Sequence, residues 1–544
     1  MSDVASAAET KLADIRRLAT THPGRAVQMA LEARKQGISD PLIHHLAGLS
    51  LKQSGQFDAA ILEFGEGLKR DPDNVVLMTL VGFCLIELGR RPEAAQVFEQ
   101  ALKRDPRAIE ANFGYGWAAE GLGALDQAQS AWERTVALAP THADALAGLS
   151  GLAVRRRDWA LARNFAERAA AADSRQTDAL MNLARIELGL QDYPAAELRL
   201  SALIVLTDLK PLARANAKIM LGDALDGQKR YSDAYGAYAE GKGDLRNLHA
   251  DVYERPGARS ALDSVQRLLT AFKATPPQAW AKPRRSAARQ PCAGHVFLLG
   301  FPRSGTTLLE QVLATHPGIV TLEERPALLK AEVEFLASPD GVGRLADVMG
   351  DSLDTFREDY WRRVAEFGVD VKGKVFVDKQ PLNTFRLPLL YKMFPDAKII
   401  FAIRDPRDVV LSCFRRSFNM NASMYQFNTL MGAALYYATV MESGAAYREA
   451  LPLDLFQHRY EDLVRDFTGT GQKLCAFLGV PWTAALEGFA KTAGERRIAT
   501  PSSTQVGRGL YDGAIDQWRH YDFALAPVTP ILRPWIDAFG YATD

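Results

Sequence analysis

Residues 295–317 read HVFLLGFPRSGTTLLEQVLATHP, and this stretch decides the fold of the second half of the chain. The apolar run at 296–299 predicts a buried strand, and the amphipathic pattern after Gly305 predicts a helix. Between them, Gly300 and Gly305 enclose four residues in the loop GFPRSGTT. Such a loop turns backbone N–H groups around an anion and directs a helix N-terminus at it. The stretch therefore predicts a strand, an anion-binding loop and a helix.

The end of this loop differs from that of loops that bind nucleoside triphosphates. Those loops end in Gly-Lys-Ser/Thr, and the lysine reaches the terminal phosphates. Here the residues are Gly305, Thr306 and Thr307, and Arg303 lies inside the loop. Arginine offers a planar, always-charged fork that suits a phosphate or a sulfate. We therefore expect a phosphate-like ligand, without the usual lysine for a γ-phosphate.

The composition is that of a globular protein whose 544 residues suffice for two or three domains. Lys+Arg and Asp+Glu both number 65, so the zero net charge favours neither nucleic acid nor a membrane surface as a partner. The N-terminus lacks the apolar core of a signal peptide, and no apolar run reaches membrane-spanning length. The four cysteines and nine histidines show no metal-binding spacing. We expect a cytoplasmic protein without a bound metal.

The first half of the chain repeats with a period of 34 residues. Alanines mark the period, at Ala26, Ala60, Ala94, Ala128, Ala162, Ala196 and Ala234. The last interval is 38 residues long, which indicates a short insertion. Aromatic residues follow four positions later at Phe64, Phe98, Trp132 and Tyr238. Glycines stand twelve positions before the alanines, at Gly48, Gly82, Gly116 and Gly222, and prolines twelve after, at Pro72, Pro106 and Pro140. This is the pattern of tetratricopeptide repeats.

We predict a solenoid of helix pairs over residues 1–250, with a half-repeat cap at 10–40. Small residues let antiparallel helices approach closely, and the proline ends the second helix of a pair. Such a solenoid can support the rest of the chain, or offer a groove to a protein or peptide partner, and both roles can hold.

Residues 251–290 are expected to form a helical linker, and residues 291–544 an α/β domain. Strand-like runs alternate with helical stretches in this last part; the runs lie at 296–299, 374–377, 397–403 and 453–460. Apolar strands that alternate with helices predict a parallel sheet covered on both faces. The segments GFPRSGTT, DKQP and RDPRD each follow a strand, so we expect them to converge at one edge of the sheet.

Two of these segments resemble the donor-binding segments of sulfotransferases that use 3′-phosphoadenosine 5′-phosphosulfate (PAPS). GFPRSGTTLLEQVLATHP is similar to their 5′-phosphosulfate loop, and AKIIFAIRDPRDVVLSCF to their 3′-phosphate segment. The resemblance implies that these residues bind the donor: Pro302, Arg303, Ser304, Gly305, Thr306, Thr307, Arg404 and Ser412. The likeness extends to about residue 530 and is nearest to the tyrosylprotein-sulfotransferase-like branch. A P-loop-like sulfotransferase domain is therefore expected.

Shorter matches imply the chemistry of the same family. Glu323-Glu324-Arg325 resembles a Glu-x-Arg motif whose glutamate is the base, which implies Glu323 as the base and Glu324 as the second choice. Lys379 in DKQP matches a lysine that contacts the departing phosphate and the sulfonate.

A late segment at 500–508 resembles one that closes over the cofactor. The match implies a catalytic role for Ser502 and a place for Arg508 near the cofactor phosphates. Gly509 stands where the family often has a proline, so this match is the loosest of the set.

The residues also fit the chemistry that sulfonate transfer requires. A carboxylate such as that of Glu323 can take a proton from the acceptor hydroxyl. Arg303, Lys379 and the N–H groups of the loop can stabilise charge on the leaving phosphate. The transfer needs no metal ion, and the sequence shows no metal-ligand pattern.

Other interpretations stay open from the residues alone. Lys379 also suits a solvated strand end, Glu323 a helix N-terminus and Ser502 a loop or helix cap. A P-loop kinase-like phosphotransferase and a repeat scaffold with an inactive transferase domain are the alternative functions. The acceptor is a hydroxyl, either a tyrosine of a protein or peptide, with the repeats as platform, or one on a polysaccharide, lipid or small metabolite.

Overall fold

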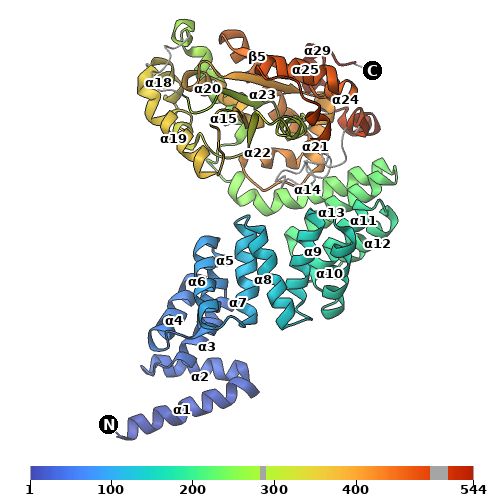
Figure 1. Cartoon of the computed structure of the whole chain (residues 1–544). Coiled ribbons are helices and arrows are strands. Elements are labelled where there is room, and N and C mark those ends of the chain that lie inside the picture. The colour runs from blue at the N-terminus through green and yellow to red at the C-terminus, as the bar shows by residue number, and fades with distance from the viewer. Residues whose placement is uncertain (1, 282–289, 349, 490–511, 543–544) are drawn as a thin grey trace. The chain divides into compact units, whose positions relative to one another are not determined.

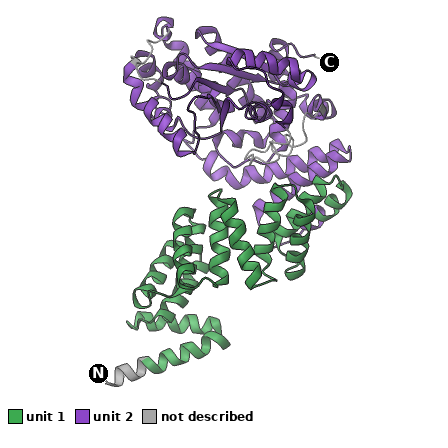
Figure 2. Cartoon of the chain, in the orientation of Figure 1, with its two compact units in different colours: residues 1–199 green, residues 200–544 purple. Residues whose placement is uncertain are grey.

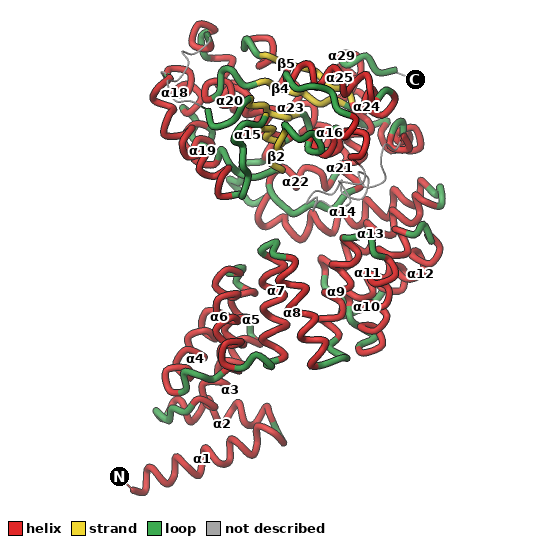
Figure 3. Tube along the Cα trace, in the orientation of Figure 1, coloured by secondary structure: helices red, strands yellow, loops and turns green. Residues whose placement is uncertain are grey.

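The computed structural model describes residues 2–281, 290–348, 350–489 and 512–542. The chain divides into two compact units, residues 1–199 and 200–544 (Figure 2). The described part of the first unit is helical, and the second unit contains a sheet covered by helices (Figures 1 and 3). This confirms the predicted order of a helical repeat region followed by an α/β domain.

The helices follow the 34-residue period of the sequence. The first helices of successive pairs are α3 (Pro41–Gln53), α5 (Val75–Glu87), α7 (Ile109–Gly121), α9 (Ala143–Arg155), α11 (Thr177–Gly189) and α13 (Pro211–Gly227). The second helices are α4 (Phe57–Arg70), α6 (Arg91–Arg104), α8 (Leu125–Leu138), α10 (Trp159–Ala172), α12 (Tyr193–Ile204) and α14 (Tyr231–Tyr253). Helix α13 has 17 residues, whereas α11 has 13, so the insertion indicated by the alanine spacing lengthens α13 by about one turn.

A close contact between a glycine and an aromatic ring holds the two helices of a repeat together. A Cβ atom at Gly82 would stand 2.5 Å from the ring of Phe98, and one at Gly116 would stand 2.5 Å from the ring of Trp132. The same contact recurs between Gly48 and Phe64 and between Gly222 and Tyr238. Any larger residue would push the helices apart, which explains why glycine and an aromatic residue recur together in the sequence.

A complete helix pair, rather than a half-repeat, precedes the first full repeat. Helices α1 (Ser2–Thr21) and α2 (Pro23–Lys35) share a small core in which Ile15 packs with Ala26 and Ala30. The predicted cap at 10–40 was too short, because the marker residues of the pattern fall on α2 alone.

The second unit contains a five-stranded parallel sheet in the order β2-β3-β1-β4-β5. The strands are β1 (Gly294–Leu299), β2 (Ile319–Glu323), β3 (Val375–Lys379), β4 (Lys398–Ile403) and β5 (Asp454–Arg459). Four of them match the apolar runs of the sequence. The sequence shows little signal for β2, because it is a short edge strand in which only Ile319 and Leu322 are buried.

Helices cover both faces of the sheet, as the continuous apolar strands predict (Figure 3). On one face, Val296 and Leu298 of β1 pack against Leu309 of α16 (Thr306–Leu313). On the other face, Phe297 packs near Tyr360 of α19 (Asp354–Glu366). Helix α15 (Ala261–Ala274) belongs to this second core, which it shares with α23 (Leu430–Ala450).

The last repeat pair, α13 and α14, belongs to the second unit. Asp226 of α13 forms an ion pair of 2.7 Å with the buried Arg415, the last residue of α21 (Pro406–Arg415). Asp223 pairs with Arg416 at 3.1 Å, and Nζ of Lys242 donates a 2.6 Å hydrogen bond to the carbonyl of Arg416. The compact unit therefore begins at Leu200, earlier than the boundary near 250 that the repeat pattern predicts.

Membrane and metal features can be assessed only for the described residues. Within them, no helix is long and apolar enough to cross a membrane. The four cysteines are all free thiols. In the same residues, no group of three or more His, Cys, Asp or Glu side chains is arranged to hold a metal ion.

A truncation series tests the role of the last repeat pair. A chain that starts at residue 200 should fold, whereas one that starts at 251 should be insoluble or strongly destabilised. The shorter chain loses the carboxylate partner of the buried Arg415, and leaving a buried charge unpaired costs about 3–5 kcal/mol. Scanning calorimetry of both fragments checks this, and equal melting temperatures would show that α13 and α14 are dispensable.

Candidate functional site

Two glycines shape the loop that follows β1. A Cβ atom at Gly300 would lie 2.4 Å from the carbonyl oxygen of Ala402, and one at Gly305 would lie 2.5 Å from the ring of Tyr460. Gly305 has φ = 89°, a left-handed conformation that favours glycine, and it is the N-cap of α16. The backbone is therefore packed tightly against its neighbours where the helix N-terminus opens.

Arg303 stands in this loop with an unusual backbone and a buried side chain. Its φ of 73° is in the left-handed region, which costs a non-glycine residue about 1 kcal/mol or more. Nε donates a 2.9 Å hydrogen bond to Oγ of Ser412, so the loop and the Arg404–Ser412 segment meet directly. Burial, together with the positive charges of Arg416 and Arg404, lowers the pKa of Arg303 to about 9. A bound anion would offset this accumulation of positive charge.

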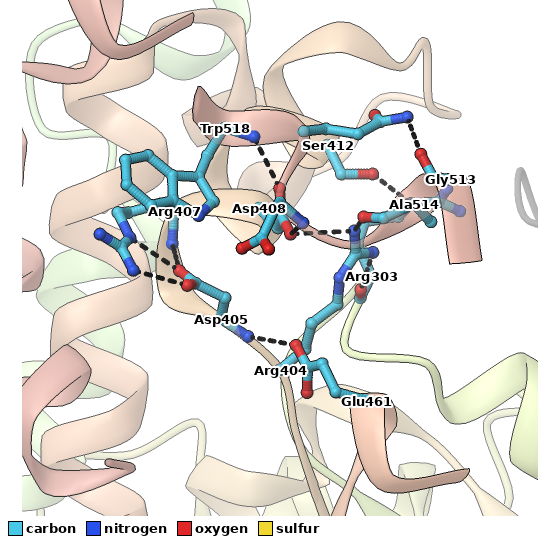
Figure 4. Close-up of polar contacts among 12 residues, drawn as sticks. Arg303, Arg404, Asp405, Arg407, Asp408, Ser412, Glu461, Gly513, Ala514 and Trp518 are labelled. Atoms are coloured by element: carbon cyan, nitrogen blue, oxygen red, sulfur yellow. Dashed lines mark hydrogen bonds and ion pairs between the residues drawn. The ribbon is translucent and has the colours of Figure 1, made fainter. Parts of the chain in front are cut away.

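Arg404 follows β4 and lies against the same loop (Figure 4). Its guanidinium donates a hydrogen bond of 3.3 Å to the carbonyl of Arg303 and another to that of Ala514. It also lies 3.7 Å from the carboxylate of Asp408 and 4.9 Å from the ring centroid of Tyr460. Its buried Nε makes no hydrogen bond within the described part of the chain. Arg404 therefore keeps an unused donor in a region crowded with cations.

Buried carboxylates fix the backbone around Arg404. The carboxylate of Asp408 accepts hydrogen bonds of 2.9 Å from the backbone N–H groups of Asp516 and Trp518. Burial raises the pKa of Asp408 to about 6, although Arg404 and these two N–H groups oppose the shift. Glu461 accepts a 3.1 Å hydrogen bond from the N–H of Asp405 (Figure 4). These carboxylates therefore hold the backbone segments on either side of Arg404 in place.

Lys379 ends β3 and is completely buried. Its Nζ lies 2.7 Å from Oε1 of Glu324, 3.5 Å from Oε1 of Glu323 and 3.4 Å from Oε2 of Glu310. Burial alone would lower the pKa of Lys379, but the three carboxylates outweigh burial and raise it. Lys379 is therefore a charged group in a buried ionic cluster rather than a solvated strand end.

Glu323 and Glu324 both reach Lys379, although alternation along an extended segment places neighbouring side chains on opposite sides. Both carboxyl groups therefore lie beside the same ammonium group. Glu324 follows the last residue of β2 and has φ = 46°, so the extended backbone ends between the two residues. Its N–H also donates a 2.9 Å hydrogen bond to the carbonyl of Lys379, which anchors the turn.

The structure places most of the sequence-predicted residues at the carboxyl ends of neighbouring strands. Ser304, Thr306 and Thr307 are buried in the loop, and Pro302 O accepts a contact of 3.4 Å from Sγ of Cys413. Ser502 and Arg508 lie outside the described residues, so their roles stay predictions.

Sequence reasoning missed Glu310, Asp408 and Arg416. Glu310 had a signal, since it follows the loop threonines by one helical turn on an otherwise apolar helix face. Asp408 and Arg416 act through contacts with residues far along the chain, for which the sequence carries no local signal.

Comparison with known proteins agrees with both units. Residues 295–484 match the family model of the sulfotransferase family, and residues 51–111 and 85–143 match two models of the tetratricopeptide repeat. The second unit contains a sulfotransferase family domain. Tetratricopeptide repeats precede it.

The relatives lie at low sequence identity. An uncharacterized protein of Aquifex aeolicus is 26% identical over 361 residues, which cover 64% of this chain and 45% of that protein. Protein-tyrosine sulfotransferase A of Caenorhabditis elegans is 26% identical over 197 residues, covering 34% of this chain and 50% of that protein. Protein-tyrosine sulfotransferase 1 of Danio rerio is 27% identical over 237 residues, covering 41% and 65%. The chain thus spans about half the length of the curated relatives it matches.

Substitution of Gly305 tests how tightly this sulfotransferase loop is packed. Gly305→Ala should lower stability more than Gly368→Ala, which also has a left-handed φ but has nothing within 4 Å of the added methyl group. Both variants incur left-handed strain of about 1–2 kcal/mol, and only the first also displaces the ring of Tyr460. Calorimetry of the two variants checks the difference. Equal losses would mean that the ring moves aside freely.

Proposed function

We propose that this protein is a PAPS-dependent sulfotransferase that transfers a sulfonate to a hydroxyl acceptor. The observation that carries the proposal is the convergence of positive charge at the loop. Arg303 is buried with its pKa depressed, Arg404 and Arg416 add to the positive potential, and Ser412 joins loop and helix. A dianionic phosphate or a phosphosulfate matches this environment better than a neutral ligand does.

The residues present fit the PAPS donor. The buried Nε of Arg404 is a donor without a partner in the described part of the chain, and it lies beside the loop that carries Arg303. The loop N–H groups and Arg303 would hold the 5′-phosphosulfate, and Arg404 with Ser412 would hold the 3′-phosphate. When bound, PAPS supplies an activated sulfonate and leaves as 3′-phosphoadenosine 5′-phosphate (PAP).

The cluster around Lys379 supplies the groups that act on the acceptor. Lys379 can stabilise negative charge on the sulfonate and on the departing phosphate. A glutamate beside it can take the proton of the acceptor hydroxyl. Resemblance favours Glu323 for this step, whereas exposure favours Glu324, whose side chain is 37% exposed against 17% for Glu323. An acceptor must reach the base, so the structure makes Glu324 a full rival.

For the acceptor, we propose a tyrosine of a protein or peptide. Several relatives are named protein-tyrosine sulfotransferases, and the helical repeats can serve as a platform for a protein. Mass spectrometry of cell extract incubated with the enzyme and isotopically labelled PAPS identifies the acceptor. Label on a lipid, polysaccharide or small metabolite would refute tyrosine as the acceptor but would still support sulfotransferase activity.

Nucleotide binding separates the sulfotransferase from a kinase. The loop lacks the Gly-Lys pair of nucleoside triphosphate loops, so PAP should raise the melting temperature more than ATP with Mg²⁺ does. A larger shift with ATP and Mg²⁺ would favour the phosphotransferase, and no shift with either nucleotide would favour an inactive domain.

Arg404→Ala should weaken donor binding more than it slows the chemical step. The 3′-phosphate is remote from the reacting sulfur, and loss of a charge-assisted contact costs about 1.5–3 kcal/mol, roughly tenfold to a hundredfold in affinity. Calorimetric titration with PAP measures the change, with a melting curve of the variant to confirm folding. An unchanged affinity removes Arg404 from the site.

A paired comparison identifies the base. Glu323→Gln and Glu324→Gln both keep the shape of the side chain and remove the proton acceptor. Loss of the base should lower turnover by about 10²–10⁴-fold with little change in PAP affinity. If only Glu324→Gln loses turnover, the base is one residue later than the resemblance implies. If both variants stay active, neither glutamate is the base.

A further inference from the structure

Glu310 has no role in the proposed transfer, yet it belongs to the ionic cluster at the centre of the site. It lies on α16, one helical turn after the loop, and it is 2% exposed. Oε2 of Glu310 lies 3.4 Å from Nζ of Lys379, which also faces Glu323 and Glu324 within 3.5 Å. One ammonium group therefore faces three carboxyl groups.

The charge of this cluster does not balance. With all three carboxyl groups ionised, the buried cluster would carry two net negative charges. Carboxyl groups that share one site do not all ionise near neutral pH, so at least one of them binds a proton more tightly than usual. Glu310 is the most buried of the three, although hydrogen bonds with Thr321 and Lys379 favour its charged form. It is the natural place for that proton.

The surroundings of Glu310 agree with this assignment. The elements packed against α16 present one cation, Lys379 of β3, and one further carboxylate, Glu323 of β2, with Glu324 on the far side of the lysine. Strand β1 packs on α16 through Val296 and Leu298, and the short helix Ala484–Gly488 through Leu486, while its Glu487 is exposed. Burial raises the pKa of Glu310 to about 7; Lys379 opposes this shift and Glu323 adds to it.

We propose that Glu310 is a positioning residue that takes up a proton when the anionic donor binds and thereby releases Lys379 to the donor. This inference rests on the proposed function, because it assumes that a phosphate or sulfonate approaches Lys379. In the donor-free protein, the ammonium is shared among the carboxylates. An anion beside it adds negative charge, which favours the protonated form of Glu310. The proton comes from solvent, forms an O–H bond at Glu310 and returns when the product leaves.

The sign of the pH dependence follows from this coupling. At a pH below the pKa of Glu310, its carboxyl group is already protonated, so binding of the donor takes up no proton. Above it, each donor bound draws a proton from solvent, and the affinity falls by up to about tenfold per pH unit. Glu310→Gln is permanently neutral, so its affinity should be nearly flat over the same range. Glu310→Asp keeps a titratable group, so it should keep a pH dependence, but with a displaced midpoint because the shorter side chain changes the distance to Lys379.

Calorimetric titration of the full chain with PAP measures the coupling directly. Heats are recorded at pH 7.5 in two buffers with different ionisation enthalpies, which gives the number of protons taken up per PAP bound. We expect proton uptake in the wild type and in Glu310→Asp, and clearly smaller uptake in Glu310→Gln. The uptake that remains in Glu310→Gln gives the contribution of the phosphates of PAP itself. Glu449→Gln, on the exposed end of α23, is the control and should match the wild type.

The outcomes separate this inference from the proposed function. If PAP does not bind the wild type, the proposed function fails. If PAP binds and Glu310→Gln shows the same uptake and pH profile as the wild type, the positioning role is overturned while the sulfotransferase assignment stands. Should Glu310→Gln not fold, Glu310→Asp decides, because its shorter side chain changes the distance to Lys379. A pH profile of Glu310→Asp identical to that of the wild type would then exclude Glu310.

Discussion

The buried guanidinium of Arg303 is the constraint on which the rest of the site depends. A charged group held out of water is stable only where its neighbours compensate it. Arg303 needs the left-handed turn between the two glycines, the hydroxyl of Ser412 and the helix that carries Ser412. That helix ends at Arg415, which in turn needs Asp226 of the last repeat pair. A hydrogen bond and an ion pair thus connect the loop after β1 to the repeat helices α13 and α14 within the second unit.

This linkage explains why the compact unit starts at Leu200 and not where the repeat pattern ends. Helices α13 and α14 have the sequence of a repeat, with Gly222 packed on Tyr238, and their carboxylates are used by the sulfotransferase domain. A repeat pattern records only how two helices approach each other. It does not record which larger core the pair joins, because that depends on partners nearly two hundred residues away.

Much of the fold could be predicted because its signals are local. The glycine–aromatic spacing fixes each helix pair, and four of the five strands are short apolar runs. The loop after β1 could be predicted equally well, since Gly300, Arg303 and Gly305 lie close together in the sequence. What could not be predicted are features that arise from tertiary contact: the edge strand β2, the left-handed turn at Glu324 and the convergence of Glu310 on Lys379. Each depends on a neighbour from another element rather than on the residue's own surroundings in the chain.

The two halves of the site differ in charge. Around Arg303, the guanidinium groups of Arg404 and Arg416 add positive charge, and Asp408 and Asp223 pair with these two arginines. Around Lys379, three carboxyl groups face one cation. In the proposed transfer, an anionic donor would bind at the first half, and the proton leaving the acceptor would go to the second. Lys379 joins the two halves, since it is the cation of the acidic half and its strand β3 pairs with the strand that leads into the donor loop. In the proposed transfer, the position of this one ammonium group would connect charge on the leaving group with proton removal from the acceptor.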